Sequence, residues 1–131
     1  PGAGETLVAR KPRTGIVVPG GKGCNQAVAA ARLGRGCVRF VGRLGNDVHA
    51  GMLEKALADA GVDASLCRRT DSPSGQGYVF LLESGEVASI VVSGSNSDWD
   101  GFGPGECAEA VAGAAAVLLQ REVPERVNEG I

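Results

Sequence analysis

A glycine-rich stretch near the beginning of the sequence, residues 19–27, carries the side chains best suited to chemistry. Glycines flank Lys22, and Asn25 follows three residues later. Glycine allows a positive φ and lets another molecule come close to the main chain. The ammonium group of Lys22 donates hydrogen bonds, and the amide of Asn25 both donates and accepts them. This combination favours a polyhydroxylated or anionic small molecule as the ligand.

An apolar, alanine-rich run over residues 27–33 follows directly, and Gly34 comes after it. Alanine and leucine are strong helix formers, and glycine commonly ends a helix. The sequence therefore predicts a tight glycine turn that leads into a helix. The first N–H groups of a helix have no partner within it, so they face outward as donors for a ligand.

Two familiar phosphate-binding motifs do not fit this stretch. A Walker A loop needs glycine at position 16 and serine or threonine at position 23, where the sequence has Ile16 and Gly23. The dinucleotide fingerprint needs glycine or alanine where Gln26 stands. On these grounds alone, a purely structural glycine turn remains an open alternative.

Composition excludes several classes of function. The net charge of the 131 residues is −2, and the basic residues are scattered, so nothing indicates nucleic acid or a membrane surface as a partner. No apolar run approaches the roughly 20 residues of a membrane span. The four cysteines form no C-x-x-C pair, which favours free thiols in a reducing compartment over a zinc site.

Two strand–turn–helix units position the glycine-rich stretch, and the first begins at the apolar residues 16–18, which are predicted to be at most a strand end. Residues 37–41 are predicted to form a short strand that Gly42 closes. Asp47 is a good N-cap for a helix over residues 48–60, which has an apolar face and ends at Gly61. Helices alternating with strands in this way indicate an α/β fold with a parallel sheet.

The second half of the chain changes character. Residues 77–82 and 87–92 are rich in β-formers and are joined by a four-residue loop with glycine, which predicts a β-hairpin. Residues 114–119 are predicted to form a buried parallel strand. Residues 120–124 would then lie at the carboxyl end of that strand, where open α/β sheets bind ligands. Pro124 suits the first turn of a further helix.

Taken together, these residues resemble the N-terminal half of the ribokinase (PfkB-type) carbohydrate kinases. The resemblance covers about residues 4–124, and its motifs are residues 20–27, Gly34, residues 40–42 and residues 45–47. It implies a ribokinase-like α/β fold, in which a parallel sheet is flanked by helices and a small β-lid covers the sugar. The whole chain, 1–131, would be the N-terminal part of one such domain, with the lid at about residues 75–93. A sheet-edge hairpin in the main domain is the alternative for that segment.

The resemblance also implies the roles of individual residues. Gly21, Lys22 and Asn25 would contact sugar hydroxyls, and Glu122 would accept a hydrogen bond from a ribose hydroxyl. The structural alternatives are a surface lysine at position 22 and a helix N-terminal charge at position 122. The single histidine, His49, has no nearby nucleophile in the sequence and is expected to be a surface residue.

The machinery for phosphoryl transfer is expected elsewhere. In the family the base is an aspartate in a Gly-Ala-Gly-Asp stretch, and no Gly-x-Gly-Asp occurs in these 131 residues. The nucleotide pocket and a monovalent-cation loop also lie in that C-terminal half. The chain begins at Pro1, and we expect an N-terminal fragment that is inactive alone, whereas the complete enzyme would use ATP, Mg²⁺ and a monovalent cation.

The function that follows from the resemblance is transfer of the γ-phosphoryl group of ATP to the 5-hydroxyl of ribose. Two alternatives remain: a non-catalytic sugar-binding or dimerising remnant, and a kinase of the same family for another sugar or a nucleoside. The expected partners are the sugar and a second copy bound through the lid, with no nucleic acid and no membrane. The expected compartment is intracellular, either the cytoplasm or an organelle.

Overall fold

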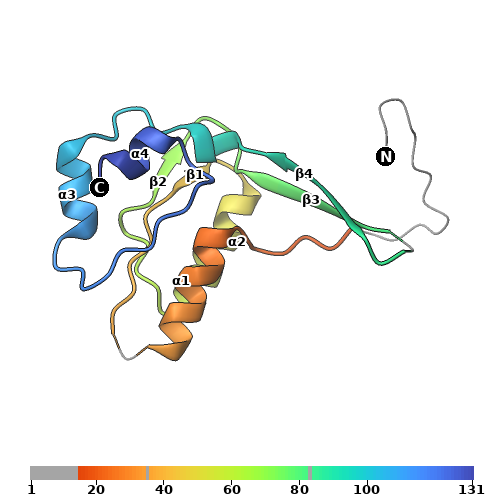
Figure 1. Cartoon of the computed structure of the whole chain (residues 1–131), viewed down its shortest axis with the longest axis horizontal. Helices are drawn as coiled ribbons and strands as arrows, with labels where there is room; N and C mark the ends of the chain where they lie inside the picture. Colours follow the sequence, from red (N-terminus) through yellow and green to blue (C-terminus); the bar gives the residue numbers. More distant parts are fainter. Residues whose placement is uncertain (1–14, 35, 83) are drawn as a thin grey trace.

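The computed structural model describes residues 15–34, 36–82 and 84–131 of the chain. The part of the family resemblance that falls on residues 4–14 lies outside this range. In order, the elements are α1 (Lys22–Leu33), β1 (Arg43–Gly45), α2 (Val48–Asp59), β2 (Arg68–Thr70), β3 (Gln76–Leu81), β4 (Val87–Val92), the 3₁₀ turn η1 (Gly94–Ser97), α3 (Pro104–Val111) and α4 (Glu125–Glu129). Figure 1 shows a body that contains the helices, with β3 and β4 projecting from it as an arm.

Helix α1 confirms the prediction of a glycine turn that leads into a helix. Gly21 is the N-cap with φ of 96°, a conformation that a residue with a side chain rarely adopts. The helix ends at Leu33, and Gly34 follows as the C-cap. Cys24 and Ala27 are buried, so the first two turns of the helix are fixed by packing.

Helix α2 was also predicted correctly, including its cap. The Asp47 carboxylate accepts a hydrogen bond from the Ala50 N–H at 3.0 Å, and Gly61 has a φ of 73° just after the helix. Leu57, which is completely buried, and Val62 pack with Cys24 and Ala27 of α1 to form the main apolar core. The two helices therefore hold each other in place.

The parallel sheet forms slightly later in the chain than predicted. Residues 37–41 make only an isolated bridge, Arg39 with Asp63, whereas β1 pairs with β2 in parallel with Arg43 opposite Arg68. Gly42 does not close the strand, because its carbonyl oxygen accepts a hydrogen bond from the Arg68 N–H at 3.1 Å. Residues 37–41 were predicted to be a strand because they are largely apolar. The strand that pairs with β2 begins only after Gly42.

The prediction of a buried strand over residues 114–119 is wrong for this structure. These residues lack regular secondary structure and are all exposed, and Leu118 has 70% of its surface accessible. A parallel strand needs a neighbour to accept its hydrogen bonds and cover on both faces. Within the described residues, no strand pairs with this segment. Residues 16–18, predicted to be at most a strand end, are exposed and irregular as well.

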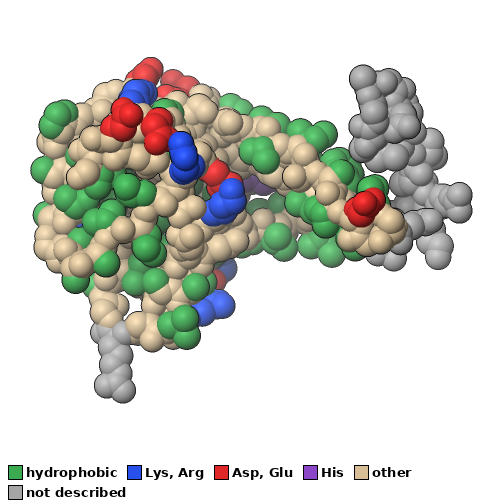
Figure 2. Space-filling model, in the orientation of Figure 1, with side chains coloured by type: hydrophobic (Ala, Val, Ile, Leu, Met, Phe, Trp, Pro, Cys, Tyr) green, Lys and Arg blue, Asp and Glu red, His purple; other side chains and the backbone are tan. Residues whose placement is uncertain are grey.

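The hairpin was predicted correctly and forms a sheet of its own. Strands β3 and β4 are antiparallel, with Gln76 opposite Val92 and Leu81 opposite Val87. Among the described strands, neither pairs with β1 or β2, so the alternative of an edge hairpin in the main sheet is not observed. Apolar side chains cover the arm in Figure 2. The large exposed ones are Tyr78, Val79, Phe80, Leu81, Val87, Ile90, Val91 and Val92.

A second cluster fixes α3 against the strands. The buried Arg43 guanidinium lies 4.4 Å from the centre of the Trp99 ring and 5.4 Å from that of Phe102. Glu106 of α3 is within 4.0 Å of Arg43 and 2.5 Å of Arg68. Removal from water lowers the pKa of Arg43, and the charge of Glu106 opposes that shift. The cluster combines cation–π contacts with ion pairs.

We predict an acid-dependent loss of stability that depends on Ser74. Hydrogen bonds from the side chain and the N–H of Ser74, together with one from the Ala50 N–H, lower the pKa of Asp47 to about 2. Because the folded-state pKa is below the unfolded value of about 3.9, the stabilisation is complete at higher pH and is lost as pH falls from about 4 to about 2. The Ser74→Ala variant should show a smaller loss over this window, measured by urea unfolding at several pH values.

Asp63 provides the internal control for this experiment. Hydrogen bonds from Ser65 lower its pKa too, and its contribution is the same in both proteins. Equal acid-dependent losses in the wild-type chain and Ser74→Ala would contradict the role given to Ser74.

Candidate functional site

The structure brings two predicted site residues into contact. The Lys22 Nζ lies 2.9 Å from Glu122 Oε1, although one residue begins α1 and the other precedes α4. Gly21, the N-cap beside Lys22, lines the same cleft as this pair. Three of the four residues predicted from the sequence therefore lie together.

A second contact joins the same two segments. The Gln120 Nε2 donates a hydrogen bond to Gln26 Oε1 at 2.6 Å. Gly23 lies between the Lys22 and Gln26 positions, and a Cβ placed there would be 3.1 Å from the Phe40 ring and 3.6 Å from the Gln120 side chain. Glycine at position 23 thus lets residues 120–122 and the Phe40 ring come close to the start of α1. Gln26 and Gln120 were not predicted as site residues, although Gln26 lies within the glycine-rich motif.

The segment that carries Glu122 is held by α4. The Asn128 side chain donates a hydrogen bond to the Gln120 carbonyl oxygen at 2.9 Å, and Arg121 pairs with Glu125 at 3.4 Å. Pro124 stands at the N-cap of α4 and ends the segment, consistent with the predicted helix start. The short helix therefore holds the main chain at Gln120, two residues before Glu122.

The Lys22–Glu122 pair is accessible to a ligand. The Lys22 side chain is 70% exposed and that of Glu122 39% exposed, so the pair is solvated and adds little to stability. A cation that donates three hydrogen bonds thus stands beside a carboxylate that only accepts them. Neighbouring hydroxyl groups, each both donor and acceptor, complement such a pair.

Asn25, the fourth predicted residue, lies elsewhere. It lines a depression of about 460 Å³ between α1 and α2, with Arg32 and Asp59. The cleft that contains Lys22 and Glu122 has a volume of about 2880 Å³ and extends along the hairpin and residues 114–119. Small-molecule pockets usually have about 300–1,000 Å³, so the described residues leave this cleft wider than a sugar needs.

The structure also shows the state of the other candidate groups. All four cysteines are free, and burial raises the pKa of Cys24 next to the site. In the part of the chain that the structure describes, no three His, Cys, Asp or Glu side chains are grouped so that they could hold a metal ion. The helices within the described ranges are all too short or too polar to span a lipid bilayer.

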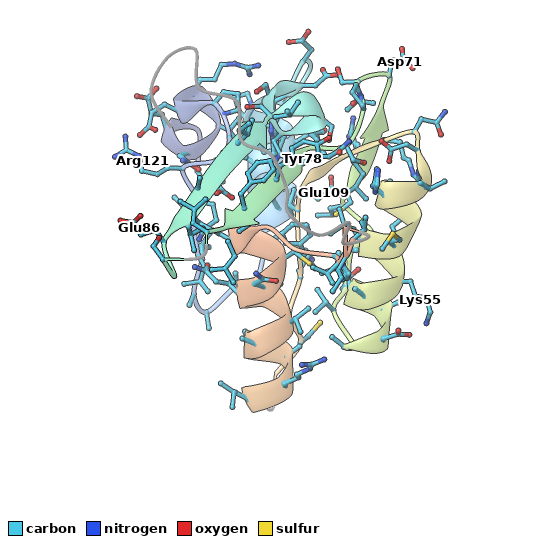
Figure 3. All side chains as sticks on the ribbon, turned by 90° about the vertical axis from the view of Figure 1, so that its right-hand side faces the viewer. Lys55, Asp71, Tyr78, Glu86, Glu109 and Arg121 are labelled. Carbon is cyan, nitrogen blue, oxygen red and sulfur yellow. The ribbon has the colours of Figure 1, made fainter. Side chains whose placement is uncertain are left out.

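Figure 3 shows how the surroundings of the site are arranged. Arg121, next to Glu122, lies on the opposite side of the view from Lys55 of α2, while Tyr78 of β3 lies between them. Tyr78 also lines the wide cleft. The hairpin therefore contributes to the lining of the cleft that contains Lys22 and Glu122.

The chain is similar to known sugar kinases in both sequence and fold. The chain is 39% identical to a ribokinase of Arabidopsis thaliana and 38% identical to one of Bacillus subtilis, over 98% and 100% of its own length. It spans only 34% and 43% of the length of those relatives. A structure of the Arabidopsis ribokinase in complex with ribose and ATP superposes with a TM-score of 0.80 at 37% identity, covering 99% of this chain and 43% of that one.

The family assignment rests on nearly the whole chain. The model of the pfkB family of carbohydrate kinases matches residues 6–130. The matched range includes the glycine-rich stretch, the hairpin and the segment with Glu122. The chain therefore belongs to the pfkB family of carbohydrate kinases.

Proposed function

We propose that this chain supplies the sugar-binding side of a ribokinase, which converts ATP and D-ribose to ADP and D-ribose 5-phosphate. The observation that carries the proposal is the contact between Lys22 and Glu122, which both line the cleft. The curated relatives named ribokinase, and the Arabidopsis structure with ribose and ATP, support ribose as the sugar.

The geometry suits recognition of hydroxyl groups. The Lys22 ammonium would donate to one ribose hydroxyl, and the Glu122 carboxylate would accept from a neighbouring one. The positive φ of Gly21 would let the sugar approach the main chain at the start of α1. A site that pairs hydroxyls discriminates strongly against sugars that lack them. Asn25 would join these residues if its side chain turned from the α1–α2 depression towards the cleft.

For a protein that contains the whole family domain, the proposal includes ATP as the phosphoryl donor. ATP would supply the transferred group, and Mg²⁺ and a monovalent cation would balance its charge. The described residues hold no group of three metal-ligating side chains, so we assign no residue of this chain to these cofactors. Its residues would bind and orient the sugar.

We also propose that the hairpin, residues 75–93, is a lid over the sugar. Tyr78 and Phe80 share one face and have 48% and 46% of their surface exposed, whereas Val79 and Leu81 on the opposite face have 69% and 76%. The less exposed face would cover the sugar. The more exposed face would pair with a second copy, because an apolar sheet surface of this kind favours association.

Replacing Lys22 tests the sugar site. Loss of a hydrogen bond to a charged group costs about 1.5–3 kcal/mol, so Lys22→Ala should weaken D-ribose binding roughly ten- to hundredfold. Isothermal titration calorimetry on the full chain measures the dissociation constant. The matched control is Lys55→Ala, because Lys55 pairs with Asp59 on α2, away from the site. Equal affinity in Lys22→Ala and the wild-type chain would refute the assignment.

A charge on the outer face of the hairpin tests dimerisation. Val79→Lys would place an ammonium in the apolar contact, and the measured mass should move from dimer towards monomer. Sedimentation velocity at several concentrations gives that mass. Val48→Lys is the control, because Val48 is similarly exposed but lies at the start of α2. A wild-type chain that is monomeric throughout would rule out the proposed dimer.

A second candidate function is a sugar-binding or dimerising module without catalysis. The absence of a Gly-x-Gly-Asp stretch from the 131 residues favours it for the chain by itself. We expect the purified chain to bind ribose and to form no ribose phosphate from ATP and Mg²⁺, as measured by mass spectrometry of the products. Turnover that disappears in Lys22→Ala would show that the chain alone is a kinase. Competition by fructose and adenosine in the binding assay would test other members of the family.

A further inference from the structure

The hairpin is attached to the body at a small polar junction. Ser74, just before β3, donates from its N–H to Asp47 Oδ2 at 2.8 Å and from its hydroxyl to Asp47 Oδ1 at 2.7 Å. The same hydroxyl accepts a hydrogen bond from the Gly45 N–H at 3.1 Å. The start of the hairpin is therefore hydrogen-bonded both to β1 and to the turn that begins α2.

The other end of the hairpin is bonded to the same strand. Ser95, just after β4, donates from its hydroxyl to the Arg43 carbonyl oxygen at 3.0 Å and from its N–H to the Pro73 carbonyl oxygen at 2.8 Å. Ser74 and Ser95 are each only 1% exposed. We call Asp47, Ser74, Ser95 and the β1 main chain that they contact the hairpin junction.

Close main-chain packing stiffens the hairpin junction. A Cβ at Gly45 would collide with the main chain of Ser74, and one at Gly94 would collide with the Pro73 carbonyl oxygen. Gly94 also has a φ of 49°. These glycines let the hairpin ends approach β1 within hydrogen-bonding distance, and the three buried strand residues of β1 give them a fixed base.

Beyond the junction, the rest of the described chain makes little contact with the hairpin. Apart from Gln76 and Ala88, which are half-buried, all residues of β3 and β4 are exposed. The arm in Figure 1 leaves the body at this junction and extends away from it. Its direction is therefore set where it is attached, since the other described residues make few contacts along its length.

We propose that Asp47 is a positioning residue. It holds the hairpin at the angle that places the less exposed hairpin face, with Tyr78 and Phe80, over the cleft that contains Lys22 and Glu122. This inference rests on the proposed function, in which that face covers the sugar. A single carboxylate caps α2 and binds both the N–H and the hydroxyl of Ser74, so the helix and the hairpin share one anchor.

Asp47→Asn separates the two roles of this carboxylate. Asparagine is as good an N-cap as aspartate, so the bond from Ala50 is retained. An amide has only one acceptor oxygen, so at least one bond from Ser74 is lost. Ser74→Ala removes the hydroxyl while leaving the helix cap intact. Asp63→Asn is the matched control: it makes the same charge change in a carboxylate that binds the Ser65 N–H, away from the hairpin.

Spin labels report the angle of the hairpin directly. Cys37 is exposed and gives a label on the body, and Ser84→Cys gives one at the hairpin turn. Cys67→Ser removes the half-buried thiol, and Cys24 and Cys107 are buried. Pulsed electron–electron double resonance on the full chain, with labelled protein diluted into an excess of unlabelled protein so that distances arise within one subunit, should give one narrow distance distribution for the wild-type junction and for Asp63→Asn. We expect a broader or shifted distribution for Asp47→Asn and Ser74→Ala.

Ribose affinity provides the second measurement. If the variants hold the productive angle about a fifth of the time, the apparent dissociation constant for D-ribose rises about fivefold, with no change for Asp63→Asn. An unchanged narrow distribution in folded Asp47→Asn and Ser74→Ala overturns the proposal. So does a changed distribution with unchanged ribose affinity. If the wild-type chain binds no ribose, the proposed function fails, and the label distances still decide whether Asp47 fixes the hairpin.

Discussion

The packing of α1 against α2 is the contact on which the rest of the structure depends. Two small side chains of α1, Cys24 and Ala27, meet Leu57 and Val62 at the main core. Small residues on one helix allow a close approach to the larger side chain on the other, and interiors tolerate little empty space. This contact fixes the axis of α1, and therefore the position from which Lys22 reaches Glu122. It also fixes α2, whose capping residue Asp47 is hydrogen-bonded to the start of the hairpin.

Polar contacts then join the remaining parts to this helix pair. Arg43 shows the pattern: its side chain is buried against Trp99 and Glu106, while its carbonyl oxygen accepts a hydrogen bond from Ser95. One strand residue thus connects α3 on its side-chain side with the base of the hairpin on its main-chain side. Because buried charged groups are costly without partners, the three contacts constrain each other. The body is held by a helix core and a polar network that meet at β1.

Local signals in the sequence predicted α1, α2 and the hairpin well, because each has its own start and stop residues. Asp47 and Gly61 bound α2, and glycine marks the turn of the hairpin. The strands were harder to place, since a strand is defined by its partner. Arg43–Gly45 pairs with Arg68–Thr70, a segment with no apolar run, and residues 114–119 find no partner among the described residues. Lys22 and Glu122 were predicted through family motifs, whereas the Gln26–Gln120 bond and the link from Asp47 to Ser74 depend on tertiary geometry.

The cluster around Arg43 has a consequence for spectroscopy. The chain has a single tryptophan, Trp99, and that residue is buried beside a guanidinium group and edge-on to the Phe102 ring. Its ring nitrogen donates a hydrogen bond to the Asn96 carbonyl oxygen at 3.0 Å, in the turn that follows β4. Intrinsic fluorescence therefore reports the environment where α3, β1 and the base of the hairpin come together. The single tyrosine, Tyr78, lies out on the arm, so excitation beyond the tyrosine absorption band gives the signal of the body alone.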